Sequence, residues 1–301
     1  MANIFISRLN FYLVLFFPIT IISGPFLPDL ICSLSGCIFI YLSIKHKLKK
    51  YFISKFFILF LIFYLIILTS SLISKNPIHS LESSLFYFRF GVLALNFWYL
   101  VDTNGEKFLK YLTYSVIISI LIASFSGYFE YFFQFIINDN SLNIDKNNAI
   151  RVSGIFGEEL VLGSYISRFL PISIGLLYFT FFNKLRIFKI NLLIIIYLFF
   201  LILITFISGE RTAILNITIF LILAFLLINF NLRIKIISLF VFIISIFTLI
   251  SLDSRIYNRL ILKTLNDISN INLEENINKF YYISEEHHNA ALISLNMFRE
   301  N

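Results

Sequence analysis

The segment Ile190–Ser208 decides the fold class: it reads INLLIIIYLFFLILITFIS and contains no charged residue. A helix that crosses a lipid bilayer needs about 20 consecutive, mostly apolar residues. Ile190–Ser208 has that length and composition, and Gly209 and Glu210 separate it from another apolar run. We therefore predict that this segment is a transmembrane helix.

Eight other runs of the same kind lie along the chain, which predicts an all-α polytopic membrane protein with about nine transmembrane helices. The composition agrees, because 59% of the residues are hydrophobic and only 14% are charged, with a mean hydropathy of +0.88. A soluble domain has about 45–50% apolar and about 25% charged residues, so this composition excludes a soluble enzyme and a disordered chain. The predicted spans are roughly residues 9–25, 28–44, 56–74, 85–101, 108–136, 161–182, 190–208, 211–229 and 236–252.

The distribution of basic residues between the loops predicts the orientation, because short cytoplasmic loops are enriched in Lys and Arg. With a cytoplasmic N-terminus, 13 basic residues fall on the inner side and four on the outer side. This sorting accounts for the net charge of +7 without nucleic acid as a partner. The inner set is Arg8, Lys45, Lys47, Lys49, Lys50, Lys55, Lys107, Lys110, Lys184, Arg186, Lys189, Arg233 and Lys235, and the outer set is Lys75, Lys146, Arg151 and Arg211.

We predict that residues 1–252 form the membrane-embedded helical bundle and that residues 253–301 form a polar segment on the outer side. Ser284 has the character of a helix N-cap, and apolar residues recur at helical spacing from Ala291 to Phe298. We expect a partial outer loop that carries a helix. Because the chain ends at Asn301 with neither a helix stop signal nor a closing span, we also expect it to be truncated.

Few charged residues lie in the predicted spans, where a charge at the bilayer centre costs about 2.5–3.5 kcal/mol. All are predicted to lie towards the outer face, which favours an outward-facing polar pocket lined by guanidinium groups. Such a pocket suits a phosphorylated or carboxylated group, because arginine binds phosphate oxygens with two parallel hydrogen bonds. The alternative is that these side chains snorkel to the headgroups or join two helices. The residues are Arg89, Glu130, Arg168, Glu210 and Arg211.

Other chemistry is sparse in this sequence. The four histidines, His46, His79, His287 and His288, do not have metal-ligand spacing with Cys or His, so we expect no metal site. The chain contains neither a Walker loop nor a dinucleotide fingerprint, so we expect no cofactor. A reaction catalysed here would draw its energy from its substrate or from a gradient.

Two segments at the predicted outer surface carry motifs. The first reads RVSGIFG over Arg151–Gly157 and continues as EELVLGS to Ser164, and the second reads SGERTAIL over Ser208–Leu215. They resemble the R-x-x-G-x-F-G segment and the S-G-x-R-x-A/G-x-L signature of the superfamily of O-antigen ligases and O-antigen polymerases. The similarity covers most of the chain by layout, but only these two motifs, in this order and spacing, are specific. Arg89 also lies in a span where related polymerases carry an arginine.

The resemblance implies an inverting, metal-independent membrane glycosyltransferase. Its donor would be a glycan on undecaprenyl pyrophosphate in the outer leaflet of the bacterial inner membrane, and its acceptor would be lipid A–core or another glycan. The family's pyrophosphate-binding arginines correspond here to Arg151 and Arg211. Arg89 and Arg168 are further candidates for the same contact, and Glu210 is a candidate to orient Arg211. Fixed positive charges would stabilise the departing pyrophosphate.

The chain departs from the family's pattern at the expected base. In the family, the outer loop continues after a helix to a G-x-G turn and then to an H-N motif with the catalytic histidine. His288-Asn289 spells H-N here, but it precedes the expected helix. His288 and His287 are our catalytic candidates, since histidine suits a base near neutral pH. The alternative is a solvated helix start, with the true base beyond Asn301.

Two other functions stay open at this stage. A secondary transporter or flippase for an anionic solute or a lipid-linked glycan would show charges on both sides of the midplane, or broken helices at matching places in two halves. Neither feature is visible in the sequence. The second alternative is an inactive product whose helices still insert. The sequence does not distinguish a ligase from a polymerase.

Overall fold

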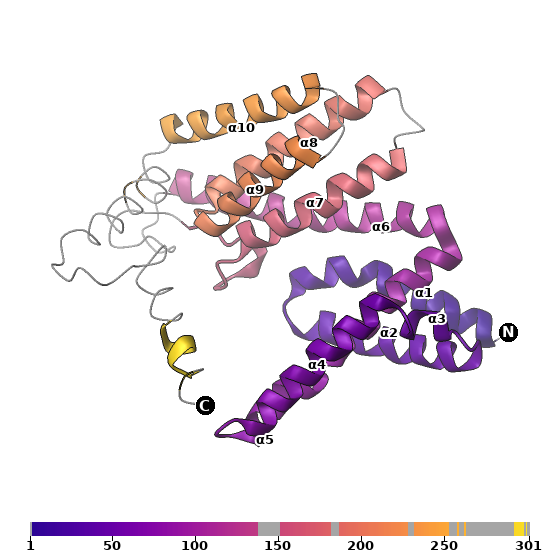
Figure 1. Ribbon diagram of the computed structural model, residues 1–301. Helices are drawn as coiled ribbons and strands as arrows, with labels where there is room; N and C mark the ends of the chain where they lie inside the picture. The colour runs from indigo at the N-terminus through magenta and orange to yellow at the C-terminus, as the bar shows by residue number, and fades with distance from the viewer. Residues whose placement is uncertain are drawn as a thin grey trace. The chain divides into compact units, whose positions relative to one another are not determined.

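The computed structural model describes residues 2–137, 151–181, 187–227, 232–252, 258, 262, 292–297 and 299. Within these residues the regular structure is helical and no strand occurs, which confirms the predicted all-α class (Figure 1). The α-helices are α1 (Ala2–Thr20), α2 (Phe26–Lys45), α3 (Lys49–Phe52), α4 (Lys55–Ile73), α5 (Pro77–Ser84), α6 (Phe88–Ile137), α7 (Leu162–Phe181), α8 (Ile187–Ile207), α9 (Arg211–Leu227) and α10 (Leu232–Leu252), and the 3-10 helices are η1 (Ile21–Ser23), η2 (Leu85–Tyr87) and η3 (Gly154–Phe156).

Five helical segments in the described part of the chain are long and apolar enough to cross a membrane. A membrane protein is therefore the class that the structure supports. The last three predicted spans are helical as α8, α9 and α10, whereas their crossing of a bilayer stays a prediction. The five segments are Phe5–Ser23, Phe26–Lys45, Lys55–Ile73, Pro77–Phe133 and Leu162–Phe181.

The fourth segment combines two predicted spans, 85–101 and 108–136, that we expected a loop to separate. The label α6 covers Phe88–Ile137, but the backbone leaves helical values at Gly105, with φ 50° and ψ −129°, so two helices meet there, between the two predicted spans. Glycine adopts a positive φ readily because it has no Cβ. A single glycine therefore interrupts the helix where the sequence predicted a longer connection.

The chain divides into two compact units: Met1–Ala123 with Pro171–Ile190, and Ser124–Leu170 with Asn191–Asn301. The helices α6, α7 and α8 contribute residues to both units. The predicted division at residue 252 concerns the side of the membrane and stays a prediction.

Buried amide groups join three helices of the first unit. Asn10 on α1 and Asn96 on α6 are fully buried and exchange two hydrogen bonds, of 2.8 and 2.9 Å. Asn96 also donates to the backbone carbonyl of Ser35 on α2, at 3.1 Å. A buried side-chain amide is costly unless it is hydrogen-bonded, and each of these two amides has its partner within the protein. This cluster therefore sets how α1, α2 and α6 pack together.

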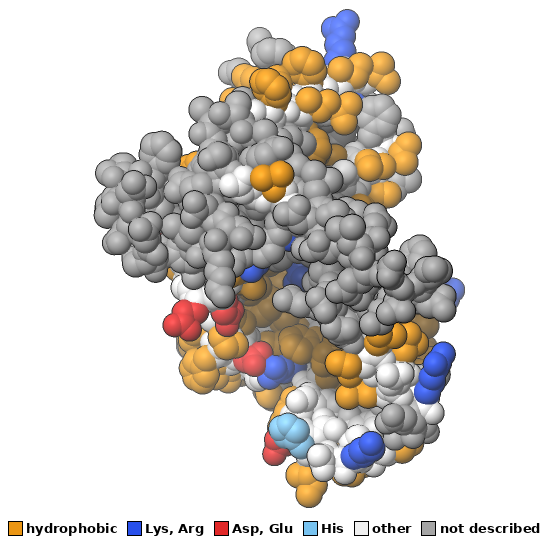
Figure 2. Space-filling model, turned by 90° about the vertical axis from the view of Figure 1, so that its left-hand side faces the viewer, with side chains coloured by type: hydrophobic (Ala, Val, Ile, Leu, Met, Phe, Trp, Pro, Cys, Tyr) orange, Lys and Arg blue, Asp and Glu red, His pale blue; other side chains and the backbone are white. Residues whose placement is uncertain are grey.

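The helix α4 exposes large hydrophobic side chains along its length, among them Leu59, Ile66 and Ile73. On the face drawn in Figure 2, most of the described side chains are hydrophobic as well. Exposed apolar surface on this scale is unusual for a protein in water and marks a surface that contacts lipid or another protein. It agrees with the membrane class.

The second unit packs α8 closely against α6. A Cβ on Gly127 of α6 would lie 3.0 Å from Ile204 on α8, so glycine allows the two backbones to approach. The next residue on α6, Tyr128, donates from its hydroxyl to the carbonyl of Phe200, which lies one turn before Ile204 on α8, at 2.8 Å. This pair of helices forms the support on which the two sequence motifs lie.

Candidate functional site

The first motif forms a loop that is held against α6 in the second unit. The backbone N–H groups of Ser153 and Gly154 donate to the same carboxylate oxygen of Glu130, the first at 3.1 Å. The backbone N–H of Ile155 donates to Ser126 Oγ at 2.9 Å. Glu130, one of the charged residues of the predicted spans, therefore binds the backbone of the motif and fixes its path.

The glycine of the first motif is required by this docking. Gly154 has a φ of +60°, and a Cβ there would lie 2.6 Å from Ser126 Oγ and 3.0 Å from the backbone nitrogen of Gly127. No side chain fits such a space without movement of the helix. The glycine of the motif therefore has a structural cause, namely the close approach of the loop to α6.

Glu210 of the second motif binds the start of α7. Its carboxylate accepts hydrogen bonds from the Gly163 N–H at 2.7 Å, the Ser164 N–H at 3.0 Å and the Ser164 hydroxyl at 2.5 Å. The first N–H groups of a helix have no acceptor inside the helix and carry a partial positive charge, so a carboxylate stabilises them. Glu210 is only 5% exposed, which removes water as a competitor.

The same contact brings the two motifs together. Gly163 belongs to the continuation of the first motif, and a Cβ on it would lie 3.1 Å from Ala213 Cβ and 3.2 Å from Glu210 Cβ. It would also overlap Ser208 Oγ. Glycine at position 163 is therefore what allows the first motif's continuation to pack directly on the second motif.

The two motif arginines are both partly buried. Arg151 opens the docked loop, and its Nε is buried without a hydrogen-bond partner among the residues described. Arg211 is the first residue of α9 and directly follows Glu210. A guanidinium keeps its charge in a partly dry position and binds phosphate oxygens through a planar fork. The second unit therefore contains two cationic groups suited to a phosphorylated ligand.

Arg89 belongs to the first unit and has a partner that the sequence analysis missed. Its Nη2 lies 2.8 Å from Oδ1 of Asp29, in the first turn of α2, and its Cζ lies 5.0 Å from the centre of the Phe90 ring. The ion pair joins two helices, which is the alternative role given above for such residues. Asp29 is the second residue of the predicted span 28–44, so a search for charges at span ends would have found it.

The remaining candidates are Arg168, His287 and His288. Arg168 is an exposed side chain on α7. The catalytic candidates His287 and His288 lie outside the described residues, as does the predicted N-cap Ser284, whereas residues 292–297 of the expected outer helix are helical. Within the described part of the chain, no group of three or more His, Cys, Asp or Glu residues could hold a metal ion.

The sequence analysis also passed over uncharged polar residues in the apolar runs. Asn10 and Asn96 are the clearest case, and asparagine inside a predicted span is itself a signal that could have identified them. Comparisons with protein families, with curated proteins and with solved structures find no match to this chain. The functional argument therefore rests on the two motifs and the contacts between them.

Proposed function

We propose that this chain is a membrane glycosyltransferase that moves a glycan from undecaprenyl pyrophosphate to lipid A–core or to another glycan chain. One observation carries the proposal: Glu210, beside Arg211, hydrogen-bonds to Gly163 and Ser164, which continue the motif that begins at Arg151. Two segments that resemble O-antigen ligases and polymerases in order and spacing are therefore also neighbours in the fold. Their contact supports a common role for the arginines they carry.

The proposal includes an arrangement in the bacterial inner membrane. The chain crosses it nine times with a cytoplasmic N-terminus, and residues 253–301 lie in the periplasm. Both motifs then lie at the periplasmic face, where the lipid-linked donor is available in the outer leaflet. The basic residues of the loops support this orientation.

The reaction is a displacement at the anomeric carbon of the donor sugar. The oxygen of an acceptor hydroxyl forms the new glycosidic bond while the bond from the anomeric carbon to the pyrophosphate oxygen breaks. Undecaprenyl pyrophosphate leaves with the electron pair, and the hydroxyl proton passes to a base, for which His288 and His287 are the candidates. The anomeric configuration inverts. No ATP is needed, because the pyrophosphate is an activated leaving group.

Arg151 and Arg211 have the proposed role of binding the pyrophosphate and stabilising the charge that develops on it. Arg168 and Arg89 are secondary candidates, and the ion pair of Arg89 with Asp29 favours a structural contribution for that residue. Glu210 positions Arg211 indirectly, because it attaches the residue next to Arg211 to the start of α7.

The test is the surface polysaccharide of cells whose only copy of the protein carries Arg211→Ala. We expect long-chain polysaccharide to be lost while the protein is still present in the membrane. Arg233→Ala is the matched control, because Arg233 is an exposed basic residue near the start of α10 on the proposed cytoplasmic side. Glycan ladders on a gel and an immunoblot of the membrane fraction measure both effects.

Normal ladders in the Arg211→Ala strain would overturn the proposal. The lipid on which glycan accumulates in the variant strain identifies the acceptor of the normal reaction. Free lipid-linked long chains indicate a failed ligase, whereas single repeats on lipid A–core indicate a failed polymerase.

A further inference from the structure

The segment Lys45–Lys55, which connects α2 to α4, carries a high density of positive charge. It reads KHKLKKYFISK, with five lysines and no acidic residue. All five lysines are exposed, and the neighbouring side chains of Ile44 and Ile53 are 76% and 70% exposed. Ammonium groups beside exposed apolar side chains are the combination with which proteins bind the surface of an anionic bilayer.

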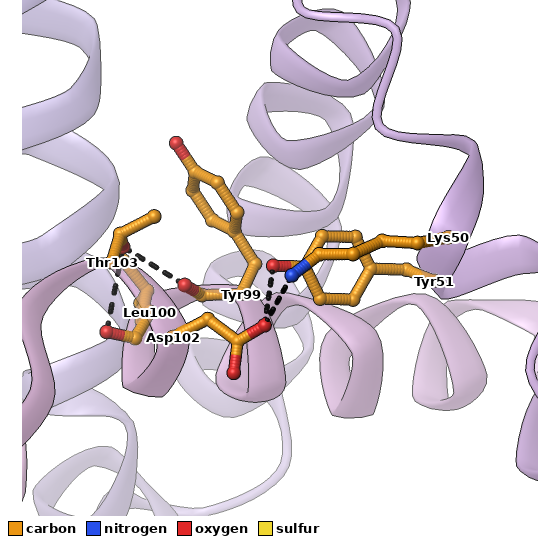
Figure 3. A network of polar contacts seen from close by, with 6 residues as sticks. All are labelled: Lys50, Tyr51, Tyr99, Leu100, Asp102 and Thr103. Atoms are coloured by element: carbon orange, nitrogen blue, oxygen red, sulfur yellow. Dashed lines mark hydrogen bonds and ion pairs between the residues drawn. The ribbon is translucent and has the colours of Figure 1, made fainter.

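Tyr51 fixes this lysine-rich segment to α6. The Tyr51 side chain is 1% exposed, and its hydroxyl donates to Asp102 Oδ2 at 3.0 Å, while Lys50 Nζ lies 2.6 Å from the same oxygen (Figure 3). The rings of Trp98 and Phe39 lie edge-on to Tyr51, with centroids 5.3 and 6.0 Å away. The hydrogen bond to Asp102 raises the pKa of Lys50. One lysine therefore takes part in holding the segment in place.

Three of the other four lysines have exposed side chains without an acidic partner among the described residues. Lys47, Lys49 and Lys55 form no ion pair with an acidic residue in the part of the chain that is described. Lys47 follows the end of α2 with a φ of 52°, and the N–H of Leu48 closes the turn by donating to the carbonyl of Ser43 at 3.0 Å. Glycine is the residue that most often occupies this place after a helix. Lysine therefore occupies a position that favours glycine, and its side chain is exposed.

We propose that the segment Lys45–Lys55 binds the headgroups of anionic phospholipids in the cytoplasmic leaflet. The helices that it joins are both long and apolar enough to cross a membrane, so the segment lies where they leave the bilayer. The free ammonium groups of Lys47, Lys49 and Lys55 contact phosphate oxygens, and the apolar side chains beside them enter the boundary of the acyl chains. The site requires the proposed orientation and is independent of glycan transfer.

Trp98 provides the measurement, because it is the single tryptophan of the chain and packs on Tyr51. The full chain is reconstituted in phosphatidylcholine vesicles that contain increasing fractions of phosphatidylglycerol. In one series the phosphatidylglycerol carries brominated acyl chains, and in the other the phosphatidylcholine does. Bromine quenches tryptophan only at short range, so the two quenching curves give the ratio of the two lipids beside this segment.

We expect phosphatidylglycerol to be enriched about threefold over its bulk fraction next to Trp98, and the enrichment to fall in 1 M salt. Lys47→Gln combined with Lys49→Gln should bring the enrichment close to one. Lys75→Gln is the control, because Lys75 is an exposed lysine beyond the other end of α4, and it should leave the enrichment unchanged. Lys47→Gly is a second variant, which removes the charge and relieves the backbone at a positive φ, so it should lower the enrichment without loss of fold.

Equal quenching by the two brominated lipids would overturn the proposal. So would an enrichment that survives both Lys47→Gly and the double glutamine variant, or one that Lys75→Gln reduces equally. If millimolar inorganic phosphate abolishes the enrichment at constant ionic strength, the segment binds free phosphate and the lipid assignment is wrong. Circular dichroism of each variant shows that the helices persist.

Discussion

At the scale of single residues, two glutamates and two glycines hold the motifs in place: the glutamates accept hydrogen bonds from the motif backbone, and the glycines allow close contacts. A buried carboxylate is costly unless it receives hydrogen bonds, and Glu210 receives three from the start of α7. Glu130 accepts hydrogen bonds from the backbone of the first motif's loop, in which Gly154 lies at the closest approach to α6. Glu130 on α6 and the motif residues Gly154, Gly163 and Glu210 therefore hold in place the two segments that carry Arg151 and Arg211.

Gly163→Ala tests the contact between the motifs. The added methyl group would overlap Ser208 Oγ and press on Ala213, so we expect the free energy of unfolding to fall by about 1–3 kcal/mol. Gly175→Ala is a matched control in the same helix, because nothing lies within 4 Å of its Cβ position. There alanine should stabilise α7 by up to about 1 kcal/mol through helix propensity. Thermal unfolding in detergent micelles measures both, and an equal response of the two variants would contradict the described packing.

At the scale of helices, hydropathy alone predicted where the helices lie, because the thickness of a bilayer fixes the length of an apolar run. It predicted separate helices on the two sides of Gly105, but it did not predict that the break between them is confined to this single residue. The pairing of Asp29 with Arg89 was missed for another reason. The two residues lie far apart in the sequence, and a list of charges contains no distances between them.

The contact of Glu210 with the start of α7 was missed for the same reason, because the sequence alone gives no distances between remote residues. The sequence predicted Glu210 and Arg211 at the start of a helix, which is α9. It did not show that the Glu210 carboxylate accepts hydrogen bonds from the start of another helix, α7. Gly154 and Gly163 are positions of close approach in the structure, which the sequence analysis did not infer for the motif glycines. The role of the arginines stays a prediction from the sequence, whereas the contacts of the residues around them came only from the structure.

The amide cluster of α1, α2 and α6 gives a prediction at this scale. Asn96→Val removes the partner of the fully buried Asn10, so the free energy of unfolding should fall by about 1–2 kcal/mol. Asn10→Val should have a similar effect. The double variant should be no less stable than either single variant, because no unpaired side-chain amide remains. Losses that simply add in the double variant, measured by unfolding in detergent, would show that the two amides do not act as a pair.

At the scale of the whole molecule, the orientation in the membrane decides whether the motifs can meet their substrate. In a background with Cys32→Ser and Cys37→Ser, cysteine is introduced at Asn76, between α4 and α5, or at His46, after α2; both positions are exposed. A maleimide that does not cross membranes should label Asn76→Cys in intact spheroplasts, whereas His46→Cys should be labelled only after permeabilisation. The reverse pattern would place the motifs on the cytoplasmic side and remove them from the donor.

Glycosidic bond formation in vesicles tests the central claim most directly. Vesicles that contain the protein are supplied with an undecaprenyl-pyrophosphate-linked glycan and with lipid A–core, and the lipids are analysed by mass spectrometry. We predict a longer glycan or a glycosylated lipid A–core, with one undecaprenyl pyrophosphate released for each bond formed, and loss of both products in Arg211→Ala but not in Arg233→Ala. An unchanged donor that merely appears on the other side of the bilayer would contradict the account and identify a flippase instead.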